Sequence, residues 1–263
     1  KKEGKLKNQK DVTVTDLPGI YSLSPYTLEE VVSRDYLLKE KPDVIIDLVD
    51  ATNIERNLYL ATQLLEIGIP VVIALNMVDL LKKNNIHINV KGLSSALGCP
   101  IVETSALKGT GLKEVVDEAI KCANQHRVPS KQMEFPKAVE KAVNEIEGFV
   151  PANIAEENKR WYAVKLLERD SKVKEGLNLP ASAQSRIEEI ASGLEKAEDD
   201  DTESIVTDGR YQYIQKVVSA NVKRSGNKMT VSDKIDRIVT NRWLALPIFA
   251  VVMFIVYYVS ITT

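Results

Sequence analysis

Short apolar runs and amphipathic segments alternate along the first half of the chain. Residues 57–67 and 111–123 carry apolar side chains at helical spacing. Strand-like runs occupy residues 12–16, 44–49, 70–75 and 101–104, and the runs at 44–49 and 70–75 are apolar enough to be buried on both faces of a sheet. This alternation predicts an α/β fold, with a doubly wound parallel sheet and right-handed crossovers.

The pattern becomes helical throughout after Val128-Pro129-Ser130, which we interpret as a linker. Helical periodicity without buried-strand runs covers residues 137–148, 158–175, 183–197 and 204–222. The sequence therefore predicts an α/β domain at 1–127, followed by a small all-helical domain at 128–222.

The chain ends in an apolar run, residues 243–261, which no charged residue interrupts. A helix of this length spans roughly 28 Å, close to the thickness of the hydrocarbon core of a bilayer. We expect a first transmembrane helix at 243–263, preceded by a basic juxtamembrane segment at 223–242. Basic residues cluster before the span, so the positive-inside rule places residues 1–242 in the cytoplasm.

Composition narrows the function classes further. The formal net charge is −2, which argues against a nucleic-acid binder that relies on bulk positive charge. Cys99 and Cys122 form no metal-ligand spacing and are interpreted as free buried thiols. The chain starts at Lys1 rather than Met and stops just after the apolar run, so we expect a fragment of a longer protein.

The first motif with a chemical meaning is Asp16-Leu17-Pro18-Gly19, directly after a strand-like run. In nucleotide switches an Asp at a strand end holds Mg²⁺ through water, and the amide of the Gly meets the γ-phosphate. Asp16 is therefore the predicted magnesium residue and Gly19 the predicted switch hinge. By itself, Asp-x-x-Gly also matches many ordinary turns.

A second motif, Asn76-Met77-Val78-Asp79, follows the strand-like run at 70–75. It fits the guanine motif Asn-Lys-x-Asp except at Met77, whose apolar chain can replace the stem of the lysine against the base. The carboxylate of Asp79 can accept two hydrogen bonds from guanine, and adenine offers no such pair of donors. A plain loop after a strand is the other interpretation of this motif in isolation.

A third motif, Ser105-Ala106, follows the run at 101–104 and fits the last guanine loop, where a backbone N–H meets guanine O6. The three motifs occur in the expected order, each after a strand. Carboxyl ends of strands meet at one edge of such a sheet, so one pocket could hold Asp16, Asn76 and Ser105. Together they predict a guanine-nucleotide switch that binds GTP or GDP with Mg²⁺.

Two expected parts are missing from the sequence. No Gly-x-x-x-x-Gly-Lys-Ser/Thr phosphate loop occurs, and we expect it upstream of Lys1, together with the threonine of the first switch. The fold class is thus a P-loop GTPase-type sheet, N-terminally truncated. No Gln follows Gly19, so the catalytic residue is unknown, and hydrolysis is expected to be slow or to use backbone groups or a bound monovalent cation.

Longer runs are more specific than these motifs, namely residues 16–37, 48–60, 76–79, 161–168 and 208–214. In these runs the chain resembles bacterial ferrous iron transport protein B, a family of FeoB-type membrane GTPases, and Met77 is typical of it. The resemblance implies a cytoplasmic GTPase domain, a helical domain that steadies bound GDP, and a multi-span Fe²⁺ permease in the bacterial inner membrane. It further implies Fe²⁺ as transported substrate, with homo-oligomers and small accessory transport proteins as partners.

Two alternatives stay open at this point. One is a membrane-tethered regulatory GTPase switch without transport activity, for which the apolar run is only an anchor. The other is a binding module without turnover, which the missing Gln favours. The residues that follow Thr263 would separate an anchor from a permease.

Overall fold

The computed structural model describes residues 2–6, 9–24, 27–81, 83–130 and 133–224, together with Met253 and Tyr257. The chain divides into two compact units, Lys1–Lys223 and Arg224–Thr263. Within the described residues, no helix combines the length and the apolar character that crossing a bilayer requires. The predicted juxtamembrane segment and span lie outside the described residues except for Lys223, Arg224, Met253 and Tyr257.

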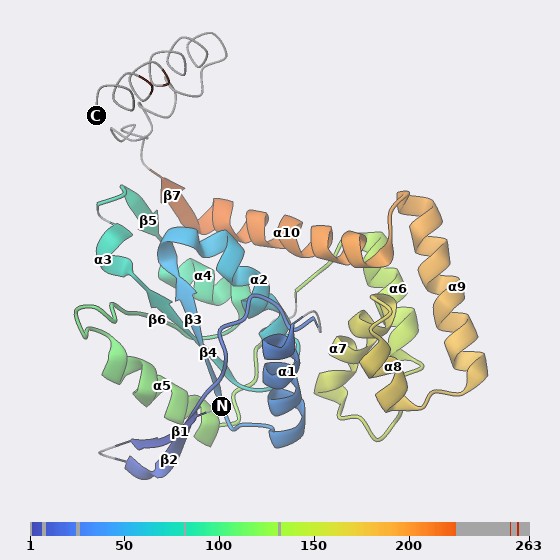
Figure 1. Ribbon diagram of the computed structural model, residues 1–263, viewed down its shortest axis with the longest axis horizontal. Helices are drawn as coiled ribbons and strands as arrows, with labels where there is room; N and C mark the ends of the chain where they lie inside the picture. Colours follow the sequence, from blue (N-terminus) through green and yellow to red (C-terminus); the bar gives the residue numbers. More distant parts are fainter. Residues whose placement is uncertain are drawn as a thin grey trace. The chain divides into compact units, whose positions relative to one another are not determined.

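Three parallel strands form the central sheet in the order β3 (Ile45–Asp50), β4 (Val71–Asn76) and β6 (Ile101–Glu103). Helices α2 (Ile54–Leu65) and α5 (Leu112–Asn124) belong to the hydrophobic clusters on its opposite faces (Figure 1). Val72 packs with Ala119 and Cys122 of α5, whereas its neighbours in β4 join the core that contains α2. The predicted doubly wound α/β sheet is confirmed.

A separate antiparallel hairpin precedes this sheet, made of β1 (Lys2–Leu6) and β2 (Gln9–Asp16). The sequence predicted only its second strand, since β1 lacks an apolar pattern. Helix α1 (Leu28–Glu40) was also missed, although Thr27 and Glu30 form a capping box at its start. Among the described strands only β4 pairs with β3, so the other edge of β3 is open.

Short elements complete the first half of the chain. The 3₁₀ turn Ala51–Asn53 joins β3 to α2, and the others are α3 (Val78–Leu81), β5 (Ile86–Ile88) and α4 (Val90–Leu97). Strand β5 pairs with β7 (Val222–Arg224) in a small two-stranded sheet. These elements follow the strand ends of the central sheet and support the loops that the sequence singled out.

The second half is helical, as predicted, and consists of α6 (Lys137–Glu147), α7 (Glu156–Leu167), α8 (Ser171–Leu177), α9 (Ala181–Glu198) and α10 (Thr202–Asn221). The single helix predicted over 158–175 is wrong. Arg169 has a left-handed backbone with φ of 57°, and Asp170 caps a new helix by accepting from the amide of Val173 at 3.1 Å. Ion pairs from Arg169 to Glu188 and Glu195 hold this break, and periodicity cannot report such contacts.

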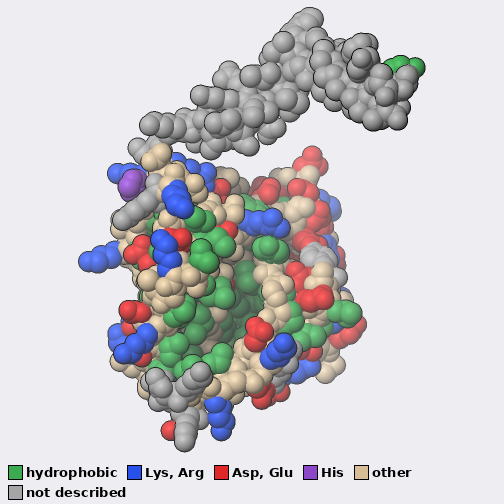
Figure 2. All heavy atoms as spheres, turned by 60° about the vertical axis from the view of Figure 1, so that its left-hand side comes forward, with side chains coloured by type: hydrophobic (Ala, Val, Ile, Leu, Met, Phe, Trp, Pro, Cys, Tyr) green, Lys and Arg blue, Asp and Glu red, His purple; other side chains and the backbone are tan. Residues whose placement is uncertain are grey.

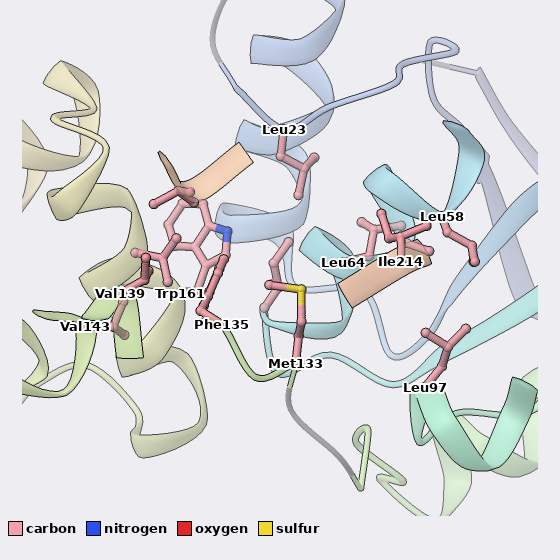
Figure 3. Packing of buried hydrophobic residues seen from close by; sticks show 14 of the residues in the cluster. Leu23, Leu58, Leu64, Leu97, Met133, Phe135, Val139, Val143, Trp161 and Ile214 are labelled. Atoms are coloured by element: carbon pink, nitrogen blue, oxygen red, sulfur yellow. The ribbon is translucent and has the colours of Figure 1, made fainter. Parts of the chain in front are cut away.

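One hydrophobic core runs through both halves of the first unit. Trp161 and Phe135 from the helical half lie in the same cluster as Leu23 and Leu64 from the α/β half (Figure 3). Helix α10 extends from the helical side to the sheet side (Figure 1) and contacts both α2 and α9. The two halves therefore pack as one body, with Ile214 of α10 in the shared core (Figure 3).

Two fully buried ion pairs cross between the halves. Arg210 of α10 donates to both carboxylate oxygens of Glu66 at 2.9 and 2.7 Å, and neither side chain is more than 1% exposed. Arg34 of α1 donates to Asp170 at 2.5 Å, and both side chains are 3% exposed. Such charges are tolerated in a core only when they are paired with good geometry, so both pairs fix how the halves fit together.

Candidate functional site

Two of the three predicted motifs meet at the carboxyl edge of the central sheet. Asn76 ends β4, and Thr104 follows β6 in the neighbouring position. The amide of Thr104 donates to the carbonyl of Leu75 at 2.8 Å, and the amide of Val78 donates to the carbonyl of Thr104 at 3.3 Å. These backbone bonds tie the loop after β4 to the loop after β6.

The side chain of Asn76 strengthens the same connection. Its Oδ1 accepts from the amide of Ala106 at 3.0 Å and from the hydroxyl of Thr104 at 3.5 Å. Asn76 therefore joins the two loops through its side chain as well as through the backbone. Because the amide of Ala106 is already used, the amide of Leu107 is the one in this part of the described loop that no hydrogen bond engages.

Asp79 lies at the start of α3 and faces the second loop. Its Oδ1 accepts from the hydroxyl of Ser105 at 2.8 Å, and its Oδ2 lies 3.9 Å from Nζ of Lys108. The side chain of Asp79 is only 12% exposed. A carboxylate offers about four lone-pair sites, so two remain for a ligand.

The loop after β6 is closed on itself and is therefore well defined. Ser105 and Thr110 exchange two backbone hydrogen bonds of 3.1 and 3.2 Å. Gly111 has φ of 77°, and a Cβ on it would lie 2.1 Å from the carbonyl oxygen of Glu103. The sequence analysis missed this closure, although the spacing of Gly109 and Gly111 is the signal that could have indicated it.

Two apolar side chains project from these loops. Met77 is 41% exposed and has φ of 63°, and Leu107 is 90% exposed. A left-handed backbone is unfavourable for a side chain such as that of Met, so the loop holds Met77 in a strained conformation. An exposed apolar side chain next to Asp79 can cover the face of a flat ring.

Asp50 ends β3 at the same edge and was not singled out by the sequence analysis. Burial raises its pKa, but hydrogen bonds from Asn53 and Thr52 outweigh that effect and lower the pKa overall. Thr52 donates from its amide at 2.8 Å and from its hydroxyl at 2.7 Å. Asp50 thus acts as an ionised cap of the turn into α2.

The structure does not bring Asp16 and Gly19 into this cluster. Both are exposed at the end of β2, which belongs to the separate hairpin, and among the described residues no hydrogen bond joins them to the guanine loops. The segment is anchored a few residues later, where the amide of Leu23 donates to Oε1 of Gln63 at 2.6 Å. Leu23 and Gln63 are both fully buried.

One face of strand β3 is exposed. Ile46 and Leu48 on β3 are 38% and 70% exposed, which is unusual for apolar residues of a central sheet. Figure 2 shows a hollow with hydrophobic walls on the face that it presents. An additional strand and helix would cover such a surface.

The Asp16 region fits a magnesium ion held mainly by water and phosphate, rather than a metal ion enclosed by protein side chains. Among the described residues, no group of three or more His, Cys, Asp or Glu side chains could hold a metal ion. The carboxylate of Asp16 is exposed and makes no hydrogen bond or ion pair with the described residues. Mg²⁺ keeps several waters and often takes only one or two carboxylates along with phosphates, so a lone carboxylate fits it.

Comparison with known proteins agrees with this architecture. Residues 1–119 match the family model described as ferrous iron transport protein B, and residues 135–223 match that of the FeoB cytosolic helical domain. The chain is 35% identical to the Fe(2+) transporter FeoB of Escherichia coli over 274 residues, which cover 99% of this chain and 34% of that protein. The chain thus spans about a third of the length of this relative.

Two solved structures are similar to most of the chain. NFeoB from S. thermophilus with bound mGMPPNP has a TM-score of 0.77 at 43% identity, and the match covers 86% of this chain and 85% of that one. The same protein bound to GDP·AlF4− and K+ has a TM-score of 0.78 at 44% identity, covering 83% and 85%. The protein therefore belongs to the family of ferrous iron transport protein B, of which it carries the GTPase and cytosolic helical regions.

Proposed function

We propose that this chain is the GTP-binding and GTP-hydrolysing cytoplasmic part of a transporter that takes up Fe²⁺ across the bacterial inner membrane. The single observation that carries the proposal is the Asn76–Asp79–Ser105 cluster, in which a nearly buried carboxylate has spare acceptor sites. Guanine presents two adjacent donors, N1–H and the 2-amino group, to such a carboxylate. Adenine offers no such pair of donors and would leave the two spare acceptor sites of Asp79 unfilled, so guanine is preferred.

Each predicted residue has a role in binding the base. Asp79 accepts from guanine, Ser105 orients Asp79 through its hydroxyl, and Asn76 holds the loop that carries Ala106. Met77 covers the ring with its apolar chain in place of the usual lysine stem. Since the amide of Ala106 donates to Asn76, the amide of Leu107 is the better donor for guanine O6.

The phosphate side is proposed to be completed by a strand and phosphate loop that precede Lys1 in the complete protein. The open edge of β3 and its exposed Leu48 support that position. Asp16 would hold Mg²⁺ through water, and Gly19 would meet the γ-phosphate. Magnesium would neutralise phosphate charge during hydrolysis. The open space around Gly19 allows that approach.

The water-positioning Gln of Ras-like GTPases does not follow Gly19, where Ile20 and Tyr21 stand instead. We propose that a monovalent cation takes part in hydrolysis, which the K+ bound to the similar NFeoB structure supports. A rise in turnover by the complete protein when Na+ is replaced by K+ is the expected result.

We place the border between the GTPase domain and the helical domain at residues 127 and 128. Residues 1–242 would lie on the cytoplasmic side of a first membrane span at 243–263. The matched relatives support iron transport. Homo-oligomers and small accessory transport proteins are proposed on the family resemblance alone. A membrane-tethered regulatory GTPase remains the alternative. Loss of Fe²⁺ uptake by cells whose complete protein carries a disrupted guanine site would separate transport from mere tethering.

The base-binding claim is tested by Asp79→Asn in the complete protein. Fluorescent GDP and XDP are titrated against both forms, because xanthine offers an acceptor where guanine has its amino group. We expect the preference for guanine over xanthine nucleotides to reverse, with a change of about 100-fold in their affinity ratio. Unchanged guanine selectivity would remove Asp79 from its role. The 263-residue chain alone is expected to bind GTP poorly, since it lacks a phosphate cradle.

A further inference from the structure

Lys108 is the one described basic side chain whose charge reaches the carboxylate of Asp79. Its Nζ lies 3.9 Å from Oδ2, while Ser105 contacts the other oxygen at 2.8 Å. The usual lysine of the guanine motif is replaced by Met77 in this chain. A lysine therefore does stand at the site, but it comes from the loop after β6.

The loop geometry explains why Lys108 is held there. The amide of Lys108 donates to the carbonyl of Ser105 at 3.1 Å, and the paired Ser105 and Thr110 close the turn behind it. Gly109, with φ of 66°, turns the chain back toward Thr110. Lys108 thus sits at a fixed place on a short closed loop, although its side chain is 60% exposed.

Contacts to both carboxylate oxygens can set the orientation of the Asp79 carboxylate, whereas a contact to one oxygen cannot. The terminal torsion of an Asp side chain is broad, so the single bond from Ser105 to Oδ1 leaves the plane of the carboxylate free to rotate. The positive charge of Lys108 favours the orientation in which Oδ2 faces it. One lone pair on each oxygen then remains, which matches the two adjacent donors of guanine.

We infer that Lys108 is a specificity-determining positioning residue, which orients the carboxylate of Asp79 so that both guanine donors, and not only N1–H, are bound. This inference rests on the guanine-nucleotide function proposed above. Inosine nucleotides are the informative probe, because hypoxanthine keeps N1–H and lacks the 2-amino group. Lys108 therefore affects GDP more than IDP.

The experiment titrates fluorescent GDP and IDP against the complete protein with Lys108→Met, Lys108→Arg or Lys113→Met. Lys113 is an exposed lysine five residues further along and serves as the charge-matched control. Lys108→Met is expected to weaken GDP binding about fivefold, or about 1 kcal/mol, and IDP binding less than twofold. Lys108→Arg restores the ratio of GDP to IDP affinity, and Lys113→Met leaves it unchanged.

Three results would overturn the inference: an equal loss for GDP and IDP, which indicates a structural role for the loop, no loss for either, or the same loss in Lys113→Met. Asp79→Asn is measured alongside to separate the two proposals. If Asp79→Asn moves preference to xanthine while Lys108→Met changes nothing, only the role of Lys108 falls. If Asp79→Asn changes nothing, or if the complete protein binds no guanine nucleotide, the proposed function falls and the inference with it.

Discussion

We propose a base side and a phosphate side of the nucleotide site, and the structure builds the two in opposite ways. On the base side, the loops after β4 and β6 hold one another through Asn76, Asp79 and Ser105. On the phosphate side, Asp16 and Gly19 are exposed at the end of a separate hairpin, and the neighbouring edge of β3 is open. The proposed base side is thus held together by contacts among described residues, whereas the proposed phosphate side lies beside an open sheet edge.

The two sides differ in the contacts that order them. The base side is ordered by contacts among its own loops, over separations of about 30 residues or fewer. The segment that carries Asp16 and Gly19 is anchored a few residues later by the buried hydrogen bond from the amide of Leu23 to Gln63, over a separation of 40 residues. Substitutions can therefore be chosen that affect the packing of the whole first unit, the proposed base side or the proposed phosphate side.

Breaking the buried ion pair that joins the α/β half to the helical half has the largest expected effect. Arg210→Met leaves Glu66 as an unpaired charge in the core, and we expect a loss of about 3–5 kcal/mol in the free energy of unfolding. Urea denaturation of the chain measures it. The double change Arg210→Met with Glu66→Met should recover much of this loss. Arg186→Met, which breaks a half-exposed pair, should lose less than about 1 kcal/mol, and an equal loss in both single variants would contradict the expectation.

A second prediction concerns the buried carboxyl group of Asp47 in β3 and its effect on stability. It is buried in β3, its Oδ2 has no hydrogen-bond partner among the described residues, and burial raises the pKa of its carboxyl to about 7. The unfolded chain releases this proton near pH 4, so stability falls as pH rises from about 4 to about 7 and then levels off.

Asp47→Asn should remove that slope and stabilise the chain by at most about 4 kcal/mol at pH 8, with little effect near pH 4. Urea denaturation across this pH range measures the effect. The exposed Asp43→Asn serves as the control. A variant that gains nothing at pH 8 would show that Asp47 is ionised at little cost.

Gly111→Ala is expected to disturb only the loop after β6, on the proposed base side. The new Cβ would meet the carbonyl oxygen of Glu103 and would also be strained by the positive φ, so we expect a loss of about 3 kcal/mol. Gly109→Ala shares the positive φ but has no atom within 4 Å of its Cβ, and should lose about 1 kcal/mol. Denaturation of both variants gives the comparison, and similar losses would argue against a close approach at Gly111.

Gln63→Met affects the segment on the proposed phosphate side and has the smallest expected effect on stability. It leaves the buried amide of Leu23 without its acceptor, at about 1–2 kcal/mol. Hydrogen exchange should accelerate at the amide of Leu23 and stay unchanged at the amide of Thr104 on the base side. Ser22→Ala removes the 3.3 Å contacts to Gln63 and the bonds to Ser24 at 3.0 and 3.1 Å, but it keeps the acceptor of the Leu23 amide and should leave both amides protected. Faster exchange at Thr104 would mean that the two sides are not independent.

The sequence predicted the sheet, and the meeting of the loops that carry Asn76, Asp79 and Ser105, because both depend on local patterns. Buried strands such as Val71–Asn76 are recognised from their apolar runs, and Asn76 and Asp79 from a motif that follows one. Lys108 was missed because its role depends on the shape of a loop. Glu66 and Arg210 were missed because charged residues on a helix are usually solvated, and nothing local shows that two of them meet across the core.

The Glu66–Arg210 pair also bears on how the protein is made. The two residues are separated by 144 positions, and Arg34 and Asp170 by 136, so the ribosome releases each first partner long before its second. Until α10 emerges, α2 carries a carboxylate that cannot be buried without a large penalty. The α/β half therefore cannot reach its final packing during synthesis ahead of the helical half. A chain stopped before α10 is consequently expected to remain a target for chaperones and proteases.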